Sequence, residues 1–204
     1  MFVSRGTGEE MGVGATGVLV DVIAQQINGS DIEAIEYPAS LDDPLYFQSV
    51  SNGTTLVKEA ITNYAAACPM VAAILFGDPT HREDAPYNYG NGTGSGVFWR
   101  HDISPCEALG SRIRSYCDAG DPYCDVNYDP DIYTHLKYIE RYGIDVAQFV
   151  VGQYYNGGAT NAPTGTGVAG SPPTSSPVTV SESGKISVMI CPIMTTALLV
   201  LGLI

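Results

Sequence analysis

A short apolar run, VAAILF at residues 71–76, constrains the fold of this chain more than any other feature. A continuous apolar run of this length is typical of a strand buried on both faces of a parallel sheet. Helical patterns lie before and after it, over Leu56–Ala67 and Ile144–Val151. Because parallel strands are joined by long crossovers, usually helices, this alternation predicts an α/β architecture.

The other segments of residues 1–155 fit the same alternation. Phe2–Ser4, Asp31–Tyr37 and Arg112–Cys117 are predicted strands. The segment Val18–Ile27 ends at an Asn-Gly pair and is a predicted helix whose apolar face consists of Val18, Leu19, Val22, Ile23 and Ile27. Gly90–Gly96 is a loop of Gly, Asn, Thr and Ser.

Charge and composition exclude two classes of protein. Acidic side chains outnumber basic ones by 22 to 9, which gives a net charge of −13. Nucleic-acid binding depends on clustered Lys and Arg, and the sequence has no such cluster. A hydrophobic content of 45% is sufficient for a packed core, which excludes global disorder. We therefore expect one folded acidic domain with an appendage and no nucleic-acid partner.

The C-terminal part has a composition of its own. Residues 156–185 contain 20 Gly, Ser, Thr or Pro out of 30 and no aromatic residue, which predicts a flexible stalk. Residues 186–204 carry no charge, and as a helix they would extend about 28 Å, close to the thickness of a bilayer core. A polar spacer before a terminal apolar tail is typical of a cleaved lipid-anchor signal. A membrane-spanning tail helix is the alternative.

Cysteines and glycosylation sequons favour a secreted protein at the cell surface. The spacing of Cys117 and Cys124 suits a local disulfide and does not match paired zinc ligands. Asn28, Asn52 and Asn91 each begin an Asn-Gly-Ser/Thr sequon, and we expect all three in exposed turns. The first ten residues have neither the basic nor the apolar part of a signal peptide, so we expect that a leader is missing before Phe2.

Two motifs suggest a cofactor or a metal, and in both cases we prefer a plain loop. Gly12-x-Gly14-x-x-Gly17 matches a dinucleotide-binding pattern, but it does not follow its strand directly, as that pattern requires. The run from Asp125 to Asp131 resembles the start of a calcium loop, but Pro130 takes the place of the required glycine. We expect no cofactor and no metal.

Asp121 and His135 form a candidate catalytic pair. Asp121 lies in the turn between Cys117 and Cys124, which would hold its carboxylate rigidly. His135 follows a loop rich in Tyr, Asp and Pro and precedes the last helix. In α/β hydrolases the order is Ser, Asp, His: the acid orients the imidazole, which accepts the serine proton. A single His near a helix start is also compatible with a structural role.

Several short motifs occur in a fixed order along the chain. They are SRGTGE at 4–9, EYPA at 36–39, Cys68-Pro69, LFGDP at 75–79, CDAGDPYC at 117–124 and His135. In this order they resemble the fungal cutinase / acetylxylan esterase family over residues 2–153. The resemblance implies a serine esterase built as a three-layer α/β/α sandwich with a small, mostly parallel sheet. It makes Asp121 the triad acid, His135 the general base and Thr7 an oxyanion donor.

The chain departs from the family pattern directly after Pro69. In the family, a strand, a Gly-x-Ser-x-Gly elbow with the nucleophile and a helix precede the strand that ends in Gly-Asp-Pro. Here Cys68-Pro69 leads straight into 71–76, and no serine in the chain has glycines two residues before and after it. One strand–helix unit and the nucleophile serine are therefore expected to be absent.

The resemblance implies a carboxylic ester hydrolase acting on cutin, an acetylated polysaccharide or a small acyl ester. Without the nucleophile, we expect this chain to be inactive. The alternative is a non-catalytic cell-wall or polysaccharide-binding surface protein on the same scaffold. We expect a monomer, with the C-terminal tail or a lipid anchor as its link to the membrane. The predicted domains are the esterase-like part at 1–155, the stalk at 156–185 and the tail at 186–204.

Overall fold

The computed structural model describes residues 1–65, 70–157 and 201–203. They form a six-stranded sheet in the order β2-β1-β6-β3-β5-β4, in which every pairing is parallel. The strands are β1 (Phe2–Ser4), β2 (Glu33–Ala34), β3 (Ala73–Phe76), β4 (Asn88–Tyr89), β5 (Ile113–Tyr116) and β6 (Leu201–Leu203). The helices are α1 (Gly17–Gln26), α2 (Tyr46–Ala65), α3 (Ser104–Glu107), α4 (Ile132–His135) and α5 (Tyr138–Gly157), with 3-10 turns at Gly14–Thr16 and Gly110–Arg112.

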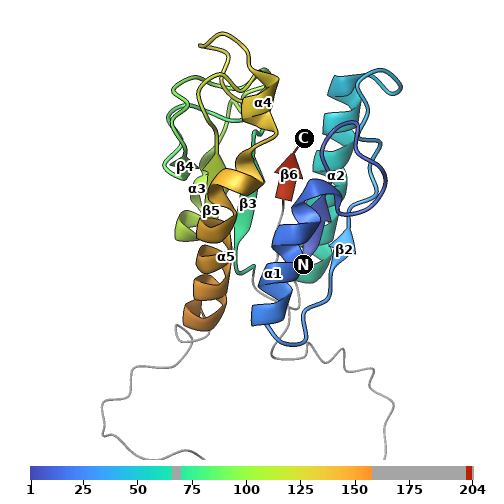
Figure 1. Cartoon of the computed structure of the whole chain (residues 1–204), viewed down its shortest axis with the longest axis vertical. Helices are drawn as coiled ribbons and strands as arrows, with labels where there is room; N and C mark the ends of the chain where they lie inside the picture. Colours follow the sequence, from blue (N-terminus) through green and yellow to red (C-terminus); the bar gives the residue numbers. More distant parts are fainter. Residues whose placement is uncertain (66–69, 158–200, 204) are drawn as a thin grey trace, which may run out of the picture.

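Helices cover both faces of the sheet (Figure 1). On one face, α1 and α5 pack together over a core that includes Val3, Ile23 and Val146. On the other face, α2 packs over a second core that includes Phe2 and Ile113. The predicted three-layer α/β/α sandwich with a small parallel sheet is confirmed.

The apolar run at 71–76 forms the central strand β3, as predicted. All four residues of β3 are buried, and they alternate between the two cores. Ile74 and Phe76 belong to the core under α1 and α5, whereas Ala73 and Leu75 belong to the core under α2. This two-sided burial explains why the run is continuously apolar.

The C-terminal strand β6 lies between β1 and β3 (Figure 1). Residues 201–203 are part of the segment for which the sequence predicts an apolar anchor. Most of that tail, and the stalk from residue 158, lie outside the described residues, as does Cys68. Within the described ranges, no helix combines the length and the apolar character needed to cross a bilayer.

Helix α2 differs from its prediction. It begins at Tyr46, ten residues before the predicted start at Leu56, so Asn52 lies on an exposed helical surface and not in a turn. Gly53 packs so closely on the ring of Tyr37 that a Cβ there would lie 2.9 Å from a ring carbon. The glycine that suggested a turn is a packing residue. Asn28 and Asn91 are exposed outside helices and strands, as expected.

Two smaller predictions also need correction. The strand predicted over Asp31–Tyr37 shortens to β2, and the backbone N–H of Tyr37 donates to the carbonyl of Ile35 in its own segment and not to β1. In α1, Val18 and Val22 are exposed and Val20 is fully buried. The buried face of α1 is thus rotated relative to the predicted one.

Candidate active site

The candidate site lies at the carboxyl edge of the sheet. Because all strands are parallel, the loops after β1, β3 and β5 leave from this same edge. The loop after β1 carries Thr7, and the segment after β5 carries Asp121 and then α4 with His135. Residues that lie far apart in the sequence therefore come together around one pocket.

Asp121 and His135 are in direct contact. Nδ1 of His135 lies 2.8 Å from Oδ2 of Asp121, and both residues are buried. The other carboxylate oxygen, Oδ1, accepts hydrogen bonds from the backbone N–H groups of Tyr123 at 2.8 Å and Cys124 at 3.3 Å. The Tyr138 hydroxyl donates to Oδ2 at 2.7 Å. Hydrogen bonds to both oxygens thus hold the carboxylate in place, with Oδ2 facing the imidazole.

The pKa of Asp121 is lowered from its ordinary value. Burial alone would raise it, but the contact with His135 and the hydrogen bonds from Tyr123 and Tyr138 favour the charged form more strongly. Burial next to Asp121 raises the pKa of the Tyr138 phenol, so that hydroxyl stays a hydrogen-bond donor. The acid of the pair is therefore an anion that can orient and stabilise a protonated imidazole.

The disulfide predicted between Cys117 and Cys124 is present, with the two Cα atoms 5.9 Å apart. It closes the loop that carries Asp121 directly after β5. Both sulfur-bearing residues are buried, and Sγ of Cys124 lies 3.4 Å from the Tyr138 hydroxyl. Cys106, in α3, is a free thiol.

Gly77, the residue after β3, was not identified from the sequence. It has a φ of +55°, a conformation that L side chains rarely adopt. A Cβ at this position would lie 2.5 Å from Nδ1 of His135 and 2.7 Å from Oδ2 of Asp121. A glycine is therefore required here for the pair to form. The signal was present in the LFGDP motif, but only the three-dimensional contact shows its meaning.

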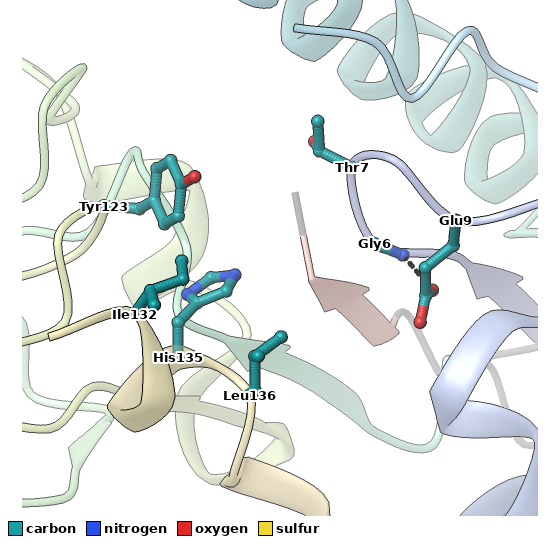
Figure 2. Close-up of a pocket in the computed structure, with 7 residues that line it drawn as sticks. All are labelled: Gly6, Thr7, Glu9, Tyr123, Ile132, His135 and Leu136. Atoms are coloured by element: carbon teal, nitrogen blue, oxygen red, sulfur yellow. Dashed lines mark hydrogen bonds between the residues drawn. The ribbon is translucent and has the colours of Figure 1, made fainter.

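His135 opens onto a pocket of about 90 Å³. Figure 2 shows the residues of α4 and the disulfide loop on one side of this pocket and the loop after β1, with Thr7, on the other. The lining residues are Gly6, Thr7, Glu9, Tyr123, Ile132, His135 and Leu136. The predicted oxyanion donor Thr7 thus faces the predicted base across one cavity, and no serine lines this pocket.

Ser95 and Ser115 do not supply a nucleophile to this pocket. The hydroxyl of Ser95 accepts a hydrogen bond from the N–H of Glu83 and is not part of the pocket lining. Ser115 lies 3.2 Å from Nδ1 of His81, but both side chains are buried. Burial lowers the pKa of His81, so this imidazole is neutral and structural.

The glycine-rich segment holds a carboxylate of the chain itself. Glu9 accepts hydrogen bonds from the N–H groups of Gly6 at 2.6 Å and Ala15 at 3.0 Å, next to the start of α1. A Cβ on Gly14 would lie 1.9 Å from a carboxylate oxygen of Glu9. Gly14 therefore makes room for Glu9, which braces the loop that carries Thr7.

In the acidic run from Asp125 to Asp131, carboxylates accept hydrogen bonds from backbone N–H groups. Asp125 accepts hydrogen bonds from the N–H groups of Thr93 and Asn127, and Asp131 caps α4 by accepting from Tyr133. Across residues 1–65, 70–157 and 201–203, no group of three or more His, Cys, Asp or Glu side chains could hold a metal ion.

Known proteins are similar to this chain in sequence and in structure. An acetylxylan esterase of Hypocrea jecorina is 30% identical over 230 residues, which covers 84% of this chain and 75% of the relative. Cutinase 11 of Verticillium dahliae is 28% identical, covering 78% of this chain and 70% of the relative. The catalytic core domain of acetyl xylan esterase from Trichoderma reesei has a TM-score of 0.66 at 28% identity, covering 74% of this chain and 96% of that domain.

The family profile matches this chain in two parts. The cutinase family profile matches residues 1–71 and 70–154, so the match is interrupted directly before β3. The alignment with the Hypocrea jecorina enzyme is longer than the part of this chain that it covers, which means that the relative has residues that this chain lacks. Over three quarters of its length, the chain nevertheless follows the profile. This chain belongs to the cutinase family.

Proposed function

We propose that this chain carries the acid–base half of a serine-esterase site and lacks its nucleophile. The observation that supports this proposal is the contact of 2.8 Å between His135 and Asp121, at a pocket that also contains Thr7. In this role His135 is the general base, Asp121 orients it, and Thr7 supplies one oxyanion donor. The substrate class is a carboxylic ester, in keeping with the esterases and cutinase to which the chain is similar.

The absent nucleophile determines what the site can do. The sequence has no Gly-x-Ser-x-Gly segment, and the pocket has no serine. Without an attacking hydroxyl, the imidazole has no proton to accept from an enzyme nucleophile, and no acyl-enzyme forms. Loss of triad members costs roughly 10⁴–10⁶ in rate.

The walls of the pocket favour the acyl part of a small ester. Ile132 and Leu136 line the pocket, although 45% and 67% of their surfaces are exposed. The cavity volume of about 90 Å³ is small, which suits a short acyl group. This supports a small acyl ester over a long-chain one.

Pre-steady-state kinetics test this proposal. We expect the full chain to release no burst of p-nitrophenolate from p-nitrophenyl butyrate. Its turnover should lie at least about 10⁴-fold below that of a family member with an intact Gly-x-Ser-x-Gly segment, assayed in parallel. A burst of one equivalent, abolished in His135→Ala, would contradict the proposal.

The second candidate is a non-catalytic surface protein that binds a cell-wall polysaccharide. The observation that favours it is a formed sheet, core and pocket in a chain without a nucleophile. Sedimentation with insoluble acetylated xylan or cutin tests this candidate. Equal retention of the wild type and His135→Ala would support it, and a wholly unbound protein would exclude it.

A secreted, monomeric protein at the cell surface completes the proposal. The Cys117–Cys124 disulfide supports an oxidising compartment, and the sequons at Asn28 and Asn91 are exposed. Glycosylation at Asn52 is proposed with them, although that residue lies in α2. Membrane attachment through residues 186–204 is the prediction that competes with the C-terminal strand inferred below, and the experiments given there decide between the two.

A further inference from the structure

The sheet has one central strand that comes from a distant part of the chain. Strands β1 and β3 do not pair with each other, because β6 lies between them. Val3 and Ser4 of β1 pair with Leu201 and Gly202. On the other side of β6, Ile74, Leu75 and Phe76 of β3 pair with Leu201, Gly202 and Leu203.

The strand on one side of this position, β3, follows directly after the interruption in the family match. The match is interrupted at residues 70–71, directly before β3, and relatives carry additional residues that this chain lacks. The sheet nevertheless keeps a one-strand space between β1 and β3, and the C-terminal residues fill it. In this chain the C-terminal residues therefore occupy a central position of the sheet.

The backbone on both sides of this space is buried. Val3, Ile74 and Phe76 are completely buried, and Ser4 is nearly so. Backbone N–H and C=O groups in such places need hydrogen-bond partners, and the loss of a partner costs the desolvation of the group left behind. Without a strand at this position, β1 and β3 would each expose an unpaired edge inside the molecule.

The C-terminal sequence suits a central strand. LLVLGLI at 198–204 is apolar throughout, as expected for a strand covered on both faces. The segment 158–200 is far longer than the dozen or so residues that a crossover between parallel strands requires.

We infer that the slot between β1 and β3 is a strand-binding site whose ligand is the chain's own segment 201–203, and that this segment completes the folded core in cis. The same residues cannot also be removed as a lipid-anchor signal. The folded protein therefore retains its C-terminal residues, and the predicted anchor and the complementing strand exclude each other.

Paired cysteines test the register directly. In the full chain, Ser4→Cys with Gly202→Cys places two thiols at paired positions, and Ser4→Cys with Leu203→Cys is the matched control, offset by one residue. Side chains of successive strand residues point to opposite faces, so only the first pair can close a disulfide. We expect an intramolecular 4–202 bond in peptide maps of the first variant and none in the control.

The other outcomes of this experiment overturn the inference. Absence of the 4–202 bond under oxidising conditions means that the segment is not in the slot. A 4–202 bond that links two chains, seen as a covalent dimer, means that the strand is exchanged in trans and contradicts completion in cis.

A proline substitution measures how much the core depends on the strand. Leu203→Pro removes a backbone N–H from the ladder, and Leu203→Val keeps it. We expect the proline variant to melt roughly 5 °C or more below the valine variant, with faster hydrogen exchange at residues 74–76. Equal melting and equal exchange would overturn the inference.

The mature C-terminus provides an independent readout. We expect peptide mapping of the full chain, secreted from a eukaryotic host, to recover residues 201–203 on the folded protein. A protein processed upstream of residue 201 that still melts cooperatively would show that the core does not need this strand.

Discussion

The carboxylate of Asp121 is held by four donors and is completely buried. Its pKa is lowered on folding, so its contribution to stability is complete above the ordinary value of 3.8 and is lost as the pH falls through the lower folded value. We expect Asp121→Asn to reduce the free energy of unfolding at neutral pH by about 1.5–3 kcal/mol. The difference in the free energy of unfolding between variant and wild type should become smaller below pH 4.

Urea unfolding between pH 7 and pH 2 measures this difference. Asp129→Asn, at an exposed position in the following loop, is the matched control and should change stability by no more than about 0.5 kcal/mol. A difference in the free energy of unfolding between Asp121→Asn and wild type that stays constant down to pH 2 would mean that folding does not lower the pKa of Asp121.

The sequence predicted Asp121 and His135 because one lies in a cysteine-bracketed turn and the other follows it in the order of a catalytic triad. It could not predict Tyr138 or Gly77. Tyr138 begins α5 and would pass for an ordinary core residue, and its bond to Asp121 depends on how α4 and α5 follow each other. Gly77 matters only because His135 comes within 2.5 Å of the place where a Cβ would be.

At the scale of elements, patterns predicted the buried strand β3 and the helices α1, α2 and α5, but not the start of α2 or the short helices α3 and α4. The first half of α2 contains Asn52 and Gly53, which favour a turn in an isolated sequence. Tertiary packing overrides that preference, since Gly53 fits against the buried ring of Tyr37. Of the strand predicted over Asp31–Tyr37 only two residues form β2, and β4 has two residues, too few for any pattern.

Two glycine substitutions separate helix propensity from packing. Alanine favours a helix over glycine by about 1 kcal/mol. Gly53→Ala should nevertheless destabilise the protein, because overpacking against Tyr37 costs about 1–3 kcal/mol. Gly152→Ala in α5, where the nearest atom is 4.0 Å away, should stabilise it by about 0.5–1 kcal/mol. Thermal melts of the two variants measure this contrast, and a Gly53→Ala protein that melts above wild type would contradict the packing of α2 on Tyr37.

At the scale of the whole molecule, the sequence predicted the three-layer fold but not the strand that the C-terminal residues form. An uncharged C-terminal segment indicates a membrane anchor when it is considered alone. Its pairing with both β1 and β3 depends on a space in the sheet that only the assembled fold contains. The fold, the pocket and the acid–base pair are thus present in a chain whose C-terminal residues form a central strand of the sheet.

Intact-mass spectrometry after treatment with an excess of a fluorophosphonate tests the central claim most directly. These reagents bond covalently to a serine that a neighbouring imidazole activates. Because His135 faces a pocket without a serine, we expect the full chain to keep its unmodified mass, while a relative with an intact nucleophile gains one adduct. A single stoichiometric adduct on a serine of this chain, absent in His135→Ala, would contradict the account.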